Sequence, residues 1–170
     1  SAWAIASPLG SSADEDFHLG SIWCATAPSS SCSQSVEDNQ YLLPSDIAGE
    51  SCFLTGYTEA SKNSAACILA NNSNRGVVST HRVNNVAGYY PPMFYRTMHL
   101  FVGSEPTESV ITMRVANSIV AVFTLGLLLV LSQRWLARPL ALALIVGLVP
   151  FGVFFIPSVN PSSWAIVGAF

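Results

Sequence analysis

The fold is decided by the stretch EPTESVITMRVANSIVAVFTLGLLLVL, which covers residues 105–131. From Val110 to about Leu131 this stretch is almost entirely apolar, with Arg114 and Asn117 in its first turns. A run of about 22 residues at 1.5 Å each gives roughly 33 Å, which is enough to cross the apolar core of a bilayer. The sequence therefore predicts a transmembrane helix at residues 109–132.

A second apolar run follows at once. We expect residues 133–139, with Arg134 and Arg138, to form a tight turn, and residues 140–157 to form a second span near the short limit. The two spans would make a transmembrane hairpin. Short loops that carry arginine stay on the cytoplasmic side, which predicts that residues 10–108 and 158–163 lie on the outer side of the plasma membrane.

Both ends of the chain also resemble parts of spans. Residues 1–9 contain the apolar run WAIA, which is interpreted as the end of a preceding, truncated span. Residues 164–170, WAIVGAF, are interpreted as the start of a further truncated span. We therefore expect the chain to be a piece of a longer multi-pass protein.

Composition and charge agree with a membrane protein. The chain is 51% hydrophobic and only 10% charged, whereas charged residues make up about 25% of an ordinary soluble domain. All ten acids lie between Asp14 and Glu108, and no basic patch indicates a nucleic-acid partner. The predicted fold class is a mainly α membrane protein fragment: a transmembrane helical hairpin plus a loop-rich extracytoplasmic domain with short helices and disulfides.

The predicted outer domain carries all four cysteines: Cys24, Cys32, Cys52 and Cys67. An even number in a loop-rich, exported segment indicates two disulfides. Three pairings are open, and short loops favour Cys24–Cys32 with Cys52–Cys67. A zinc site is the rival interpretation, although no two cysteines are separated by two intervening residues, the spacing typical of zinc ligands. Short strands are predicted at residues 67–70 and 76–80.

An acid-rich segment, SADEDFHLGSIW, occupies residues 12–23. Ser12 is a good N-cap, and the acids after it suit a first helical turn. Helical spacing then places Asp14, His18 and Ser21 on one face, and Glu15, Leu19 and Ile22 on a neighbouring face that can pack.

Two explanations fit these acids. A carboxylate beside an imidazole can act as a general base or hold a divalent cation, so Asp14 and His18 are also candidate metal ligands. The plainer alternative is an acidic helix start with a surface histidine.

A second group of polar side chains begins in the sequence YYPPMFY at residues 89–95, which we call the tyrosine–proline segment. Each residue before a proline is held extended, and Pro92 can open a helix that runs to about Val102. Helical spacing brings Tyr95, Arg96 and His99 together, a combination that suits a sugar or a phosphate-bearing ligand. The alternative is an interfacial helix whose aromatic rings sit among lipid headgroups.

Four segments in this order resemble the domain of unknown function 2142 family, which comprises predicted multi-pass bacterial membrane proteins. They are ADEDFH at 13–18, YYPPMFY at 89–95, RVAN at 114–117 and NPSS at 160–163. The family is similar to membrane glycosyltransferases of the GT-C class, which use polyprenyl-phosphate sugars. In that class an acidic motif in the first external loop holds the catalytic base or a metal.

Carried over residue by residue, the resemblance implies that Asp14 or Glu15 is the catalytic acid. It gives His18 an orienting role and matches Tyr90, with the two prolines after it, to the helix of the external loop. This chain departs from related sugar transferases in carrying Tyr90 where they often have Lys or His. The expected supporting or ligand-binding residues are Asp16, His18, Tyr90, Tyr95, Arg96, His99, Arg114 and Asn160.

The leading hypothesis is thus a fragment of an integral membrane glycosyltransferase in cell-envelope glycan assembly. Its expected partners are the bilayer, a polyprenyl-phosphate-linked sugar and a glycan acceptor, with Arg96 or Arg114 steadying the lipid phosphate. One alternative is a non-enzymatic component of polysaccharide assembly or export whose outer domain binds a glycan or a partner. Another is a transporter or channel fragment, which the spans favour least because their apolar runs after Gly126 contain no ionisable group.

Overall fold

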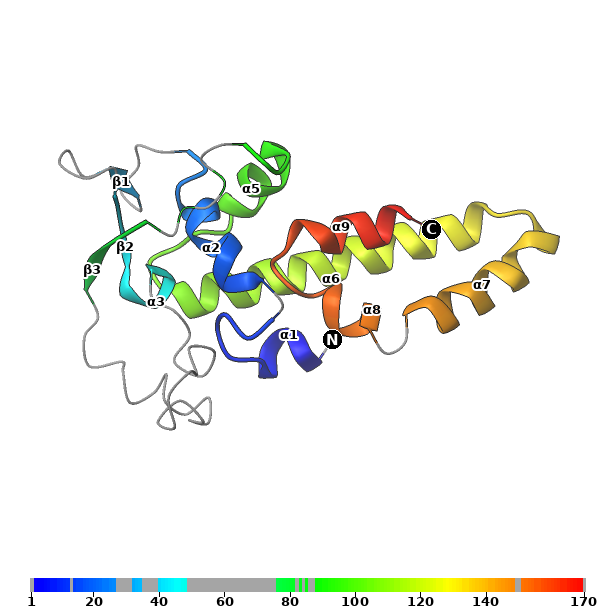
Figure 1. The fold of residues 1–170 in the computed structure, drawn as a ribbon. Coiled ribbons are helices and arrows are strands. Elements are labelled where there is room, and N and C mark those ends of the chain that lie inside the picture. The colour runs from blue at the N-terminus through cyan, green and yellow to red at the C-terminus, as the bar shows by residue number, and fades with distance from the viewer. Residues whose placement is uncertain are drawn as a thin grey trace.

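The computed structural model describes residues 2–12, 14–26, 32–34, 40–48, 76–81, 83, 85, 88–148 and 151–169. This part of the chain is mainly helical and elongated (Figure 1). A head made of α2, α5 and a small sheet lies at one end, and the long helix α6 extends away from it. Helix α7 returns beside α6 from the far end.

The helices are α1 (Ala2–Ala6), α2 (Glu15–Trp23), α3 (Ser45–Ala48), α5 (Pro92–His99), α6 (Pro106–Leu131), α7 (Arg134–Leu148), α8 (Phe151–Phe155) and α9 (Pro161–Gly168). The strands are β1 (Ser33–Gln34), β2 (Tyr41–Pro44) and β3 (Val77–Thr80), which pair antiparallel in the order β1-β2-β3. The strand predicted at residues 76–80 is therefore confirmed as β3. The one predicted at 67–70 lies outside the described residues.

A disulfide joins Cys24 to Cys32, with their Cα atoms 5.2 Å apart. This confirms the pairing that the short loop favoured, and it ties the end of α2 to the segment that enters β1. The predicted partners Cys52 and Cys67 lie outside the described residues.

The hydrophobic core lies where α2, α5 and the beginning of α6 meet. Trp23 of α2, Phe94 and Met98 of α5, and Met113 of α6 are buried together with Leu43 of β2. Burial of such large apolar side chains stabilises this junction by about 1.5–3 kcal/mol each. The core therefore fixes α2 and α5 against the first turns of α6.

Helix α6 changes character along its length. Its 26 residues give a length of about 39 Å, and among the described helices it is the one that is long and apolar enough to cross a membrane. Beyond the head its apolar side chains are open, with Val122 74% and Val130 81% exposed. Apolar side chains in such numbers suit contact with lipid rather than water.

The segment after α6 differs from the prediction. Residues 134–139, expected as a turn, are the first residues of α7, and Pro139 lies inside that helix. A proline removes one backbone hydrogen bond from a helix, which is why the sequence favoured a break, yet membrane helices tolerate proline.

Two helices cover most of the second apolar run. Helix α7 ends at Leu148 and α8 begins at Phe151. The 15 residues of α7 are about 22 Å long, less than the roughly 30 Å of a bilayer core. Helix α9 covers most of the predicted start of a further span and lies alongside α6 (Figure 1).

Candidate functional site

The candidate site begins at the entry to α2. The N-cap residue of this helix is Asp14, so the prediction of Ser12 was wrong. Asp14 has φ 54° and ψ 12°, in the left-handed region, and among the described residues no other non-glycine residue has a positive φ. Aspartate tolerates this conformation better than most residues, and backbone of this kind is concentrated at functional sites. The exposed carboxylate makes no capping bond to the helix.

The next residue, Glu15, is fully buried. Its Oε1 accepts hydrogen bonds from Arg114 Nε at 2.9 Å and from the Val159 amide at 3.3 Å. Its Oε2 accepts from the Gly10 amide at 3.0 Å and from Arg114 Nη2. Both carboxylate oxygens are therefore committed to the fold.

Arg114 completes this arrangement from α6. Its Nη1 donates to the Ser7 carbonyl at 2.6 Å and its Nη2 to the Pro8 carbonyl at 2.7 Å. The side chain is 1% exposed, so its guanidinium is enclosed by the protein. A buried ion pair is tolerated when further hydrogen bonds satisfy both partners, and here Arg114 joins residues 7–15 to α6.

His18 lies one turn after Asp14 and is buried. Its Nδ1 is 2.8 Å from the Tyr95 hydroxyl on α5, and its ring meets that of Tyr90 edge-on with centroids 5.1 Å apart. The acid-rich segment and the tyrosine–proline segment, far apart in sequence, therefore meet at this histidine. We call Asp14, His18, Tyr90 and Tyr95 the acid–histidine cluster.

Burial controls protonation in this cluster. It lowers the pKa of His18 to about 4, against the opposing charges of Asp14 and Asp16. Burial, with a smaller contribution from Tyr90, raises the pKa of the Tyr95 hydroxyl above its ordinary value. Both groups are thus neutral at pH 7.

The two other expected residues of α5 face different surroundings. His99 Nδ1 donates to the Ile22 carbonyl at 2.8 Å, which leaves its Nε2 to accept from the Thr26 hydroxyl at 2.6 Å. His99 therefore joins α5 to the end of α2 and lies apart from His18. Arg96 is exposed.

The segment before α9 is held by α6. Asn117 donates to the Ser158 carbonyl at 2.8 Å and accepts from the Trp164 indole at 3.0 Å. Asn160, an expected supporting residue, is buried, and its side-chain oxygen accepts from the Ser162 amide at 2.8 Å as the N-cap of α9. These contacts make Asn160 the N-cap of α9.

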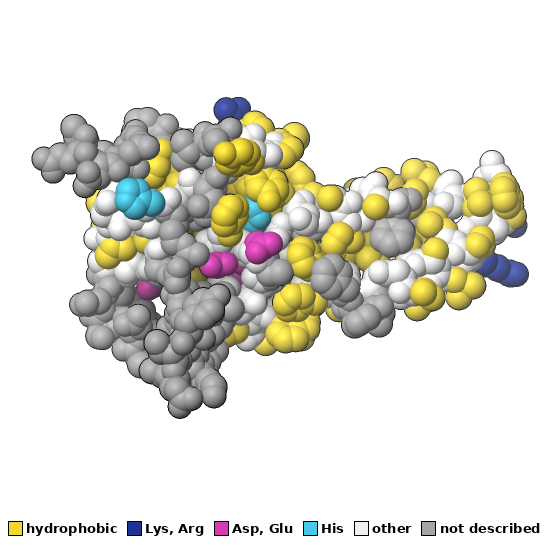
Figure 2. Space-filling view, in the orientation of Figure 1, with side chains coloured by type: hydrophobic (Ala, Val, Ile, Leu, Met, Phe, Trp, Pro, Cys, Tyr) yellow, Lys and Arg dark blue, Asp and Glu magenta, His cyan; other side chains and the backbone are white. Residues whose placement is uncertain are grey.

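The acid–histidine cluster lies beside the first turns of the candidate span. Arg114, which contacts the first residue of α2, is about 12 Å from the start of α6. Figure 2 shows acidic side chains and an imidazole close together on the face over α2, with yellow apolar side chains continuing along the α6–α7 end. The polar side chains of the acid–histidine cluster therefore lie next to the apolar surface of α6.

The family model described as "Predicted membrane protein (DUF2142)" matches residues 1–170. The chain belongs to this family. Searches of the curated proteins and of the solved structures returned no match. The DUF2142 chain is thus a predicted membrane protein with one candidate apolar span in its described part.

The described part of the DUF2142 chain contains no group of three or more His, Cys, Asp or Glu side chains placed to hold a metal ion. Asp14 and His18, the candidate ligands, thus supply two ligands at most, and the Tyr95 hydroxyl already occupies His18 Nδ1. Divalent cations with oxygen ligands take six or more donors, so the described residues do not by themselves complete such a site.

Some structural partners in the DUF2142 chain carry no sequence signal. The Gly10 amide binds Glu15 directly, and the Ser7 and Pro8 carbonyls bind its partner Arg114. Backbone groups occur in every residue, so the sequence does not mark these contacts. The burial of Glu15, Leu19 and Ile22 on one face of α2, by contrast, follows the predicted helical spacing.

Proposed function

We propose that the DUF2142 chain is part of an integral membrane glycosyltransferase that uses a polyprenyl-phosphate-linked sugar in cell-envelope glycan assembly, with Asp14 as its general base. The observation that carries this proposal is the contrast between two adjacent acids. Glu15 is buried and bound on both oxygens, whereas Asp14 presents an exposed carboxylate from a left-handed backbone. Of the two, Asp14 is the acid that can reach a substrate.

The chemistry needs few groups. The acceptor hydroxyl gives its proton to Asp14 while its oxygen bonds to the anomeric carbon of the sugar, and the bond to the polyprenyl phosphate breaks. Asp16 and the neutral His18–Tyr95 pair set the environment of that carboxylate. Because Arg114 is committed to Glu15, the exposed Arg96 is the better cation for the leaving phosphate.

The setting also supports a lipid-linked donor. The acid–histidine cluster adjoins the first turns of α6, the candidate span. A donor whose phosphate lies at the headgroup level would meet the cluster there without leaving the bilayer. The Cys24–Cys32 disulfide supports the outer side of the plasma membrane, since disulfides persist in oxidising compartments.

The test is turnover of a polyprenyl-phosphate-linked sugar by the full-length membrane protein. We expect Asp14→Asn to lower turnover by about 100-fold or more, the usual effect of removing a general base. Asp46→Asn is the matched control, because Asp46 is also an exposed acid but lies on α3. Unchanged turnover in Asp14→Asn, with activity in the wild type, would refute the assignment.

The non-enzymatic alternative is favoured by one observation. A cavity lies beside Tyr95, and it would serve glycan binding whether or not Asp14 takes a proton. Glycan binding by a wild-type protein that shows no turnover, and unchanged binding in Asp14→Asn, would support this alternative over the transferase.

A further inference from the structure

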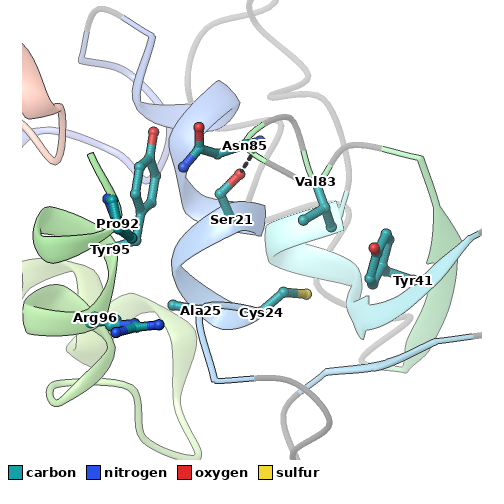
Figure 3. A pocket seen from close by; sticks show the side chains of 9 residues that line it. All are labelled: Ser21, Cys24, Ala25, Tyr41, Val83, Asn85, Pro92, Tyr95 and Arg96. Carbon is teal, nitrogen blue, oxygen red and sulfur yellow. Dashed lines mark hydrogen bonds between the residues drawn. The ribbon is translucent and has the colours of Figure 1, made fainter. Parts of the chain in front are cut away.

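A cavity of about 220 Å³ opens in the head, and we call it the Tyr95 pocket (Figure 3). Helices α2 and α5 form one side of it, and β2 with the segment around Val83 and Asn85 forms the other. Tyr41 projects from β2 opposite Arg96 of α5. Residues from four separate parts of the chain thus enclose one space.

The walls of the Tyr95 pocket are fixed by contacts within the protein. The Asn85 amide donates to Ser21 Oγ at 2.9 Å, drawn as the dashed line in Figure 3. The Asn85 side-chain oxygen accepts from the Tyr90 amide at 2.8 Å, and its Nδ2 donates to the Tyr90 carbonyl at 3.2 Å. Cys24, another lining residue, is held by its disulfide to Cys32. A largely pre-formed cavity is typical of a small-molecule site.

Among the described lining residues of the Tyr95 pocket, Arg96 is the one that carries a charge. Arg96 lines it and is exposed, and in the part of the chain that the structure describes no carboxylate lies within ion-pair distance of its guanidinium. The other described arginines are remote from it: Arg114 is buried against Glu15, and Arg134 and Arg138 are at the far end of α6. A guanidinium in this setting binds carboxylate or phosphate groups in a two-point fork.

The remaining lining suits a sugar ring. Tyr41, which is half-buried, supplies an aromatic side chain, the buried Tyr95 closes the wall beside α5, and Ser21 and Asn85 are the polar lining residues. Rigid aromatic surfaces with a few placed polar groups recognise ligands that are apolar on one face and polar at the edge. A saccharide has this character.

We propose that the Tyr95 pocket binds a saccharide unit that carries a negative charge, with the charge on Arg96 and the ring against Tyr41. The charge could come from the phosphate of a glycosyl phosphate donor or from the carboxylate of a uronic acid in the acceptor. This inference deepens the proposed function and rests on it, because Tyr95 belongs to both places. Its ring lines the pocket, and its hydroxyl meets His18 of the acid–histidine cluster.

The experiment measures binding of three probes to the full-length protein in detergent: glucose 1-phosphate, glucuronate and glucose. We expect at least one charged sugar to bind about tenfold more tightly than glucose. Arg96→Gln removes that preference, while binding of glucose is retained. Arg138→Gln is the matched control, because it removes another exposed arginine, outside the pocket, and keeps the preference.

The preferred probe identifies the source of the charge: the phosphate indicates the donor and the carboxylate indicates the acceptor. Equal binding of all three sugars, or a preference that survives Arg96→Gln, would overturn the proposal. Failure of the proposed function is a separate result. In that case Asp14→Asn leaves turnover unchanged, while the Arg96-dependent preference is still observed.

Discussion

Glu15 and Asp14 differ in environment although they are neighbours in sequence. Glu15 has its oxygens held by Arg114 and by two backbone amides, so its carboxylate acts as a structural link. Removing one partner of a buried ion pair leaves an uncompensated charge, which costs more than the pair itself contributes. A loss of function at Glu15 would therefore reflect lost structure.

We expect Glu15→Gln to destabilise the protein by about 3–5 kcal/mol, the usual cost of breaking a buried pair from one side. The measurement is the free energy of unfolding of the full-length protein in detergent. Glu108→Gln, an exposed acid on the same helix as Arg114, is the control and should change stability by less than about 0.5 kcal/mol. Equal effects of the two changes would contradict the structural role of Glu15.

The lowered pKa of His18 predicts how the stability of the protein depends on pH. Its pKa is about 4 in the folded protein and 6.5 in an unfolded chain, so between these values the unfolded chain holds more protons. The contribution of the neutral imidazole to the free energy of unfolding is complete above about pH 6.5 and is lost as the pH falls toward 4. The slope is at most about 1.4 kcal/mol per pH unit.

Unfolding midpoints measured from pH 7 to pH 4 test this dependence. The wild type should lose more stability across the window than His18→Gln does. His81→Gln replaces an exposed histidine and should keep the slope of the wild type. A slope that His18→Gln leaves intact would mean that other groups cause it.

At the scale of the element, the start of α9 has two polar residues with opposite effects on stability, the N-cap Asn160 and Ser163. Asn160 caps the helix by accepting from the Ser162 amide. Ser163 is buried, and its hydroxyl has no hydrogen-bond partner among the described residues. A satisfied cap stabilises a helix, whereas a buried hydroxyl without a partner costs free energy.

We therefore expect Asn160→Ala to destabilise the protein by about 1 kcal/mol and Ser163→Ala to be neutral or stabilising. Thermal unfolding of the two variants, which alter neighbouring sites on one helix, provides the comparison. A larger loss of stability from Ser163→Ala than from Asn160→Ala would show that the hydroxyl has an important partner.

The elements differ in how well sequence predicted them. The length of a continuous apolar run predicted α6, and Pro92 predicted the start of α5, because both signals are local. Pro139 misled the prediction of α7, since its effect depends on whether the helix has neighbours or lipid around it. The Tyr95 pocket could not be predicted, because Tyr41 and Asn85 reach it only through the tertiary fold.

At the scale of the whole molecule, the proposed arrangement has residues 10–108 outside and the connection between α6 and α7 inside. Arginines near that connection favour the cytoplasmic side. We expect a cysteine introduced at Gln133 to react with an impermeant maleimide only after the cells are permeabilised. A cysteine at Ser104, before α6 and also exposed, should react in intact cells. The reverse pattern would place the acid–histidine cluster on the cytoplasmic face.

The link between Glu15 and Arg114 has a consequence for biosynthesis. The two residues are 99 positions apart, so at a ribosomal rate of about 5–20 residues per second the glutamate waits about 5–20 s before its arginine is made. Its charge must stay hydrated during that interval. The acid-rich segment can therefore form its ion pair only after the ribosome has made the first turns of α6.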